Sequence, residues 1–459
     1  MYFSKYHTII NVCEKTFLYN TFNSSLIELD NIGWNEYRLL MQGKYEEVSP
    51  DSLDLLESQE FLLINEEQDS YRSKLIHDHY LLSKSMNSEA VKIDIGITNR
   101  CNFSCSYCFE RNNKDSKVFL NSIPSMYFKH LSSKIKEYVT EQLSLGTKAI
   151  TVTWYGGEPS LEWNFILNIN KKLAKICHEH QCDYSNIVVT NGYYLPESVL
   201  KNVSNQYFQY IQITLDGPKS YHNNRRNINS ITDSYTMILD NIMRLLSAGV
   251  EVVIRINIDK DNSEKVKTLL NELANSVPQK EIGKRLFVSF GRVFGTDKSY
   301  NLEEYEDIYR EIFMQAVRLN FVTPSIDVSL LTAFCSAESV NNNIVFDYTG
   351  NVYCCWNDIF TIEKKVGNIY DINFQEERAM LSTRYYDDLS LEHVNNGQCL
   401  NCELVNFCQG LCPYDRLQIR EAVIDNIYKN GTCKKIIKKR LATQIASLLL
   451  QNKMGNLNE

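Results

Sequence analysis

The stretch "VKIDIGITNRCNFSCSYCFE", residues 91–110, indicates the fold, because an apolar, β-branched run leads directly into three closely spaced cysteines. Runs of this kind are typical of buried strands, and they recur between segments with helical periodicity. Strands and helices that alternate at this spacing favour a parallel sheet covered by helices. We therefore predict an α/β fold in which six βα units form an open or partial (β/α)6 barrel. The predicted strands cover 91–97, 149–155, 186–191, 210–215, 250–258 and 285–290.

Turn-forming residues follow three further strands of this predicted sheet. "GGEP" (156–159) follows the second strand, "TNG" (190–192) the third, and the fourth runs into "TLDGP" (214–218). Each segment alone is an ordinary turn. Sites in parallel sheets lie at the carboxyl ends of the strands, so three such segments beside a cysteine group predict a binding site at that edge.

The fourteen cysteines fall into two groups and three strays. The start of the chain lacks the pattern of a signal peptide, and we expect a cytoplasmic protein whose thiols stay reduced. Clustered cysteines in that compartment are more often metal ligands than disulfides. The first group is Cys101, Cys105 and Cys108; the second is Cys335, Cys354, Cys355, Cys399, Cys402, Cys408, Cys412 and Cys433.

The first group, with Tyr107 before its last cysteine and "GGEP" one strand later, is similar to the pattern of the radical S-adenosylmethionine (SAM) superfamily. The resemblance covers residues from about 91 to 295. It implies that three thiolates hold three irons of a [4Fe-4S] cluster and that SAM binds the fourth iron. It also implies reductive cleavage of SAM to a 5′-deoxyadenosyl radical, with electrons from an external reductant such as flavodoxin or ferredoxin.

The same resemblance assigns the residues that would bind SAM. The aromatic residue before the last cysteine contacts the adenine side, the paired glycines meet the methionyl amino group, and a threonine ending the fourth strand touches the ribose region. An arginine after the Asp-Gly-Pro turn pairs with the SAM carboxylate; Arg226 fits by spacing, with Arg225 as a rival, and an exposed loop is the alternative for both. We assign no catalytic residue. The predicted cofactor-binding residues are Tyr107, Gly156, Gly157, Glu158, Asn191, Thr214 and Arg226.

The second cysteine group resembles the SPASM extension of radical SAM enzymes, which holds two auxiliary [4Fe-4S] clusters. A zinc ribbon is the alternative, because a Cys-x2-Cys pair is also a common zinc signal. With the SPASM resemblance, the expected cofactors are three [4Fe-4S] clusters and SAM. The implied ligands are Cys399, Cys402, Cys408 and Cys433 for the distal cluster, and Cys335, Cys355 and Cys412 for the proximal one.

The proximal set has three thiolates where four are expected. Either Cys354 supplies the fourth, or one iron is open. Adjacent side chains in an extended chain point to opposite faces, which favours the open iron. Such an iron could bind a substrate thiolate, so the reacting group could be a peptide cysteine.

The first 85 residues predict short strands followed by two helices, 31–43 and 49–61, with Ser49 and Pro50 at the start of the second. The segment 61–74 is expected to return as a wing. This order resembles the winged-helix-like domain that binds the leader of a ribosomally made precursor peptide as an added strand. A packing or dimerisation module is the alternative.

The predicted domains are therefore 1–85 for leader recognition, 86–325 for the radical SAM barrel and 326–459 for SPASM. A net charge of −8 with scattered basic residues argues against nucleic acid as a partner, and no apolar run is long enough to span a membrane.

Taken together, the patterns predict a SAM-dependent maturase that installs a thioether or carbon-carbon crosslink in a precursor peptide. An anaerobic sulfatase-maturing type of enzyme is the alternative within enzymes. It is disfavoured because such relatives have an aspartate after the equivalent of Cys355, where this chain has Trp356 and places Asp358 two residues later. A non-catalytic zinc or iron-sulfur scaffold is the alternative of another class.

Overall fold

The structure is a computed structural model, and the chain divides into two compact units. Unit 1 comprises Met1–Ser85, Pro324–Phe334 and Tyr386–Glu459, and unit 2 comprises Met86–Thr323 and Cys335–Tyr385. None of the helices described is long and apolar enough to cross a membrane. The residues that the structure describes are 1–85, 89–112, 125–201, 207–226, 233–325, 338, 343–373, 376, 399–414 and 431–455.

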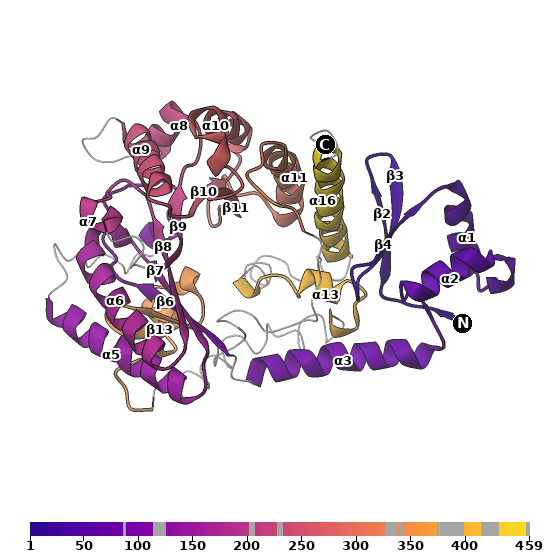
Figure 1. The fold of residues 1–459 in the computed structure, drawn as a ribbon, viewed down its shortest axis with the longest axis horizontal. Helices are drawn as coiled ribbons and strands as arrows, with labels where there is room; N and C mark the ends of the chain where they lie inside the picture. The colour runs from indigo at the N-terminus through magenta and orange to yellow at the C-terminus, as the bar shows by residue number, and fades with distance from the viewer. Residues whose placement is uncertain are drawn as a thin grey trace. The chain divides into compact units, whose positions relative to one another are not determined.

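Unit 2 is built on a nine-stranded sheet in the order β11-β10-β9-β8-β7-β6-β12-β13-β14 (Figure 1). All neighbours from β6 to β11 pair in parallel. The six strands predicted from the sequence are therefore confirmed, as is the α/β class with a partial barrel. These strands are β6 (Ala90–Gly96), β7 (Ala149–Tyr155), β8 (Asp183–Thr190), β9 (Phe208–Thr214), β10 (Val252–Ile258) and β11 (Leu286–Arg292).

Amphipathic helices connect the parallel strands and cover the sheet. In α6, for example, Ile166, Ile169 and Leu173 are buried at helical spacing. Gly146 and Gly249 have φ of +92° and +85° just after α5 and α9, as a helix C-cap glycine does. The long helices of unit 2 are α5 (Ser125–Ser144), α6 (Trp163–Glu179), α9 (Ser234–Ser247), α10 (Ser263–Ser276) and α11 (Leu302–Arg318); the short ones are α4 (Phe109–Asn112), α7 (Glu197–Leu200) and α8 (Lys219–Arg225).

Three short strands extend the sheet beyond the predicted barrel. β12 (Asn343–Asp347) pairs in parallel with β6, and β13 (Asn351–Tyr353) and β14 (Gly367–Asn368) follow antiparallel. They lie in the range predicted as SPASM, yet they continue the sheet of the barrel range. The three predicted domains stay a functional prediction.

The first residues of unit 1 form an antiparallel sheet followed by helices. β2 (His7–Val12), β3 (Lys15–Asn20) and β4 (Leu26–Leu29) pair in that order, and β1 (Tyr2–Phe3) pairs with β5 (Leu62–Leu63). The predicted helices are α1 (Asn31–Met41) and α2 (Pro50–Ser58), the latter capped by Ser49 as expected. The predicted wing is wrong beyond β5, because the chain turns into helix α3 (Glu66–Ser85). Three acidic residues in its first turn suit a helix start.

The C-terminal residues of unit 1 pack on the N-terminal ones. The described parts are α13 (Val405–Cys408) and the long helix α16 (Thr432–Gly455). One core cluster joins Tyr6 and Tyr80 to Leu400 and Val405. The Thr21 hydroxyl also donates a hydrogen bond to the carbonyl of Glu403. Residues about 380 positions apart in the chain therefore share one core.

Candidate functional site

The first cysteine group directly follows β6, at the carboxyl edge of the parallel strands, as predicted. Cys101 is exposed and Cys105 and Cys108 are half-buried, and none of the three forms a disulfide with a described cysteine. The backbone N–H of Cys108 donates to the carbonyl of Cys105 at 3.3 Å, which forms a tight turn between these two cysteines. The loop thus presents soft thiol ligands at the edge where parallel sheets bind ligands.

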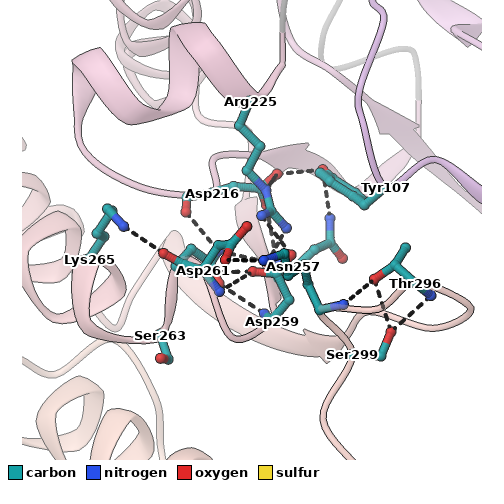
Figure 2. Close-up of polar contacts among 12 residues, drawn as sticks. Tyr107, Asp216, Arg225, Asn257, Asp259, Asp261, Ser263, Lys265, Thr296 and Ser299 are labelled. Carbon is teal, nitrogen blue, oxygen red and sulfur yellow. Dashed lines mark hydrogen bonds and ion pairs between the residues drawn. The ribbon is translucent and has the colours of Figure 1, made fainter.

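Tyr107 lies at the centre of a hydrogen-bond network, part of which Figure 2 shows. Its hydroxyl donates to Asp216 Oδ2 and accepts from Arg226 Nη1 and from Asn257 Nδ2, the last at 3.3 Å. A phenol oxygen has one donor and two acceptor positions, and all three are used. The guanidinium of Arg225 lies over the ring, 4.3 Å from its centroid. The Tyr107 ring, next to Cys108 in the chain, is thus held by hydrogen bonds at its hydroxyl and by Arg225 on one face.

The two candidate arginines have different partners. Arg225 donates to Asp259 Oδ2 at 2.7 Å and to the carbonyl of Asn257 at 3.3 Å, so its charge is balanced within the sheet edge. Arg226 contacts the Tyr107 hydroxyl and lies 5.5 Å from the ring centroid of Phe103, inside the cysteine loop. Both side chains are more than nine-tenths buried, which excludes the exposed-loop alternative. Arg226 is the arginine that faces the thiols.

The thiols and Arg226 also interact electrostatically. Burial alone lowers the pKa of Arg226, but the thiols of Cys105 and Cys101, together with Tyr107 and Asp216, raise it well above its usual value. A fixed cation beside two of the thiols suits a negatively charged thiolate cluster. The donor type and the local charge therefore fit an iron-sulfur cluster held by this loop.

Glu158 organises the strand ends on the other side of the loop. Its buried carboxylate accepts hydrogen bonds from the Thr190 hydroxyl, from the backbone N–H of Asn191 at 2.7 Å and from that of Ser160 at 2.9 Å. Asn191 in turn donates to Asn102 Oδ1 at 2.7 Å. Glu158 and Asn191 thus link two turns at the strand ends to the cysteine loop.

The paired glycines leave room for neighbouring backbone. A Cβ on Gly157 would lie 2.1 Å from the carbonyl oxygen of Arg100, just before Cys101. Gly156 has a φ of +90°, and a Cβ there would lie 2.8 Å from the carbonyl oxygen of Thr98. The neighbour that these glycines accommodate is the backbone leading into the cysteine loop, and their predicted contact with SAM stays a prediction.

Two residues of this edge were not predicted from the sequence. Glu110 accepts a hydrogen bond from the backbone N–H of Gly157 at 2.8 Å, and burial with the nearby Glu158 raises its pKa to about 7. Asn257, at the carboxyl end of β10, donates its backbone N–H to Asp216 Oδ1 at 2.9 Å. Glu110 comes two residues after the last cysteine of the motif, and Asn257 lies near the end of a predicted strand. These positions were the sequence signals that could have pointed to the two residues. Thr214 ends β9 two residues before Asp216, as expected.

Cys355 lies near the same edge of unit 2. It is followed by a 3-10 turn, Trp356–Asp358, and Trp356 stacks on Tyr155 at the end of β7 with ring centroids 5.3 Å apart. Burial, then Glu110, Cys108 and Cys355 raise the pKa of Tyr155, so both cysteines are its electrostatic neighbours. Asp358, the displaced acid, is buried and pairs with Lys364 at 2.8 Å.

The cysteines predicted for the distal cluster lie in unit 1. Burial raises the pKa of Cys402 to about 12, and Cys408 adds to this effect; burial and then Cys433 raise the pKa of Cys408. Protonated thiols must release protons to bind metal. In the described ranges, no three Cys, His, Asp or Glu side chains are grouped closely enough to hold a metal ion. Cys335 lies outside the described residues, and Cys412 is exposed in unit 1. All the cluster assignments remain predictions.

A groove of about 500 Å³ lies in the N-terminal part of unit 1. It runs along the first half of α3, and Ile64, Tyr71 and Leu75 on its wall are exposed, the first two by 74% and 67%. Glu67 adds an acidic group to the wall, whereas Glu60 on the same wall is paired with Arg72. An exposed apolar groove with charged groups on its wall is suited to binding another chain.

Comparisons with known proteins agree with this site. Residues 95–273 match the model of the radical SAM superfamily. The chain is 24% identical over 447 residues to the radical SAM cyclopropyl synthase TigE of Paramaledivibacter caminithermalis, and the match covers 89% of either chain. It is 25% identical over 236 residues to the sporulation killing factor maturation protein SkfB of Bacillus subtilis, covering 51% of this chain and 50% of SkfB.

A solved structure supports the fold. Native anSMEcpe with bound AdoMet and Cp18Cys peptide superposes with a TM-score of 0.50 at 16% identity, covering 74% of this chain and 99% of that one. At that identity the likeness concerns the fold alone.

Proposed function

The chain belongs to the radical SAM superfamily of enzymes through residues 95–273, and from this premise we propose that it modifies a ribosomally made precursor peptide by forming a carbon-carbon bond. Membership implies a [4Fe-4S] cluster and SAM, which together supply one-electron chemistry able to remove hydrogen from an unactivated carbon. Cys101, Cys105 and Cys108 would hold the cluster, and Tyr107 and Arg226 would orient SAM beside it.

The observation that carries the proposal is the extent of the match to TigE. It reaches over 89% of both chains, well beyond the radical SAM domain, so the regions before and after the barrel also have counterparts. TigE is described as a cyclopropyl synthase, and SkfB as a maturation protein. A carbon-carbon bond is therefore preferred to a thioether, which remains the second candidate through the open iron inferred for Cys335, Cys355 and Cys412.

The groove of unit 1 supports a peptide substrate. An extended leader could place apolar side chains against Ile64, Tyr71 and Leu75 and a basic side chain against Glu67. The antiparallel sheet β2-β3-β4 also has an outer strand, β4, to which a further strand could add. Two auxiliary clusters held by the C-terminal cysteines, and an external reductant, belong to the same proposal.

The test is anaerobic incubation of the reconstituted enzyme with SAM, dithionite and the small peptide encoded beside its gene, followed by mass spectrometry. We expect a product lighter by two hydrogens, absent with Cys105→Ala. Iodoacetamide then separates the candidates, because a thioether consumes a cysteine thiol and a carbon-carbon bond leaves every thiol free. An unchanged peptide mass with active wild-type enzyme would contradict the proposal.

A further inference from the structure

Asp216 is fully buried at the exit of β9, just before α8. Its Oδ2 accepts the hydrogen bond of the Tyr107 hydroxyl, and its Oδ1 accepts from the backbone N–H of Asn257 at 2.9 Å. Both oxygens of one carboxylate are thus engaged by different elements (Figure 2). The residue joins the cysteine loop to β9 and β10.

A buried carboxylate is costly unless cations compensate its charge. Arg225 Nε lies 3.5 Å and Arg226 Nη1 3.6 Å from Asp216 Oδ2. Arg225 is also paired with Asp259 at 2.7 Å. The charges of the two carboxylates and the two guanidinium groups therefore compensate each other. Asp216 is the carboxylate that lies near both arginines.

Arg226 has donors left over for a ligand. Its Nη1 donates to the Tyr107 hydroxyl, while its Nε has no hydrogen-bond partner among the described residues, although only 7% of the residue is exposed. A buried guanidinium N–H without a partner is expensive. The guanidinium lies 5.5 Å from the ring centroid of Phe103, which stands between Cys101 and Cys105 in the chain, so the unused donor lies beside the loop that would hold the cluster.

We propose that Asp216 is a positioning residue for SAM, which fixes the Tyr107 ring and the Arg226 guanidinium relative to each other and to the cysteine loop. Asp216 acts through these two side chains and does not itself touch the ligand. The carboxylate of SAM then completes the donor set of Arg226, as guanidinium groups bind carboxylates with defined geometry. The inference rests on the SAM dependence in the proposed function, but its test needs no peptide.

The test is a double-mutant cycle that measures SAM affinity on the anaerobically reconstituted protein by equilibrium dialysis. Asp216→Asn keeps the shape and removes the charge, and Tyr107→Phe keeps the ring and removes the hydroxyl. We expect each to weaken SAM binding by about 10-fold or more, since hydrogen bonds to charged groups are worth about 1.5–3 kcal/mol. The double variant should be about as weak as a single one, because both changes break the same bond.

A matched pair in the same sheet serves as the control. Tyr353 donates to Asp347 at 2.8 Å, and both are buried beside the β12–β13 turn. Asp347→Asn and Tyr353→Phe should leave SAM affinity within about 2-fold of the wild type. The hydrogen bonds of Asp347 stay within its own turn and do not involve the partners of Asp216.

Each outcome decides the inference. Unchanged SAM affinity in folded, iron-loaded Asp216→Asn overturns it, as do losses that multiply in the double variant. If Asp216→Asn fails to fold, Tyr107→Phe decides alone, and unchanged affinity there overturns the inference equally. A wild-type protein that binds SAM but modifies no peptide contradicts only the proposed function.

Discussion

His222 is a fully buried histidine beside the site, and it gives folding stability a pH dependence. Its Nδ1 accepts the backbone N–H of Asp216 at 3.4 Å, which places the ring proton on Nε2. Burial, helped by Arg226 and Arg225 and opposed by Asp216, lowers its pKa to about 3. The folded state therefore keeps the ring neutral where an unfolded chain takes up a proton.

The sign of the effect follows from linkage. Above pH ~6.5 the ring is neutral in both states, and below it only the unfolded state binds the proton, so stability falls between pH ~6.5 and ~3. The loss is on the order of 5 kcal/mol over that window. Urea unfolding at several pH values should show it, and a smaller slope is expected for His222→Gln. His180→Gln, at an exposed position, should keep the wild-type slope.

At the level of single residues, the sequence predicted the site best where a side chain has a fixed place in a motif. Tyr107 and Arg226 do form a hydrogen bond, whereas Arg225 pairs with Asp259, a difference between the two arginines that their spacing could not show. Glu110 and Asn257 were missed because their roles depend on which strand ends become neighbours. That information is absent from local spacing.

At the level of elements, the turn after β7 must pass close to the cysteine loop. Gly157→Ala would place a methyl group 2.1 Å from the carbonyl oxygen of Arg100, and backbone cannot move aside as a flexible side chain can. Overpacking of this kind costs about 1–3 kcal/mol. We expect lower stability in urea and weaker SAM binding, because the displaced backbone leads directly into Cys101.

Gly33→Ala is the matched control for that change. Gly33 lies in α1, and a Cβ there would meet only ordinary contacts, the nearest being the Leu29 side chain at 3.4 Å. Alanine is favoured over glycine in a helix by about 1 kcal/mol, so this variant should be neutral or slightly more stable. Equal stability of the two variants would contradict the close approach.

Helices and strands were predicted correctly where the hydrophobic pattern is long and regular, and they were missed where the segment is short or the pattern was misread. The strands β6 to β11 agree with the apolar runs to within a few residues. The predicted wing failed because the acidic start of α3 and its later apolar residues favour a helix. The strands β12 to β14 are two to five residues long, too short for a periodic signal.

At the level of the whole molecule, the two ends of the chain belong to one unit. The N-terminal residues Tyr6 and Tyr80 share a core with Leu400 and Val405, and Cys399 and Cys402 pack against that core. The proposed leader-binding part and the predicted distal-cluster loop are therefore built on common packing. The order of motifs along the chain suggested three consecutive domains and could not reveal this pairing of distant segments.

The central claim is that the first cysteine group makes this chain a SAM-cleaving enzyme. The most direct measurement is the formation of 5′-deoxyadenosine and methionine by the anaerobically reconstituted protein with SAM and dithionite. We expect both products from the wild type and from Cys13→Ala, an exposed cysteine in unit 1, and neither from Cys105→Ala. A wild-type protein that holds zinc without labile sulfide and forms no 5′-deoxyadenosine would contradict the claim.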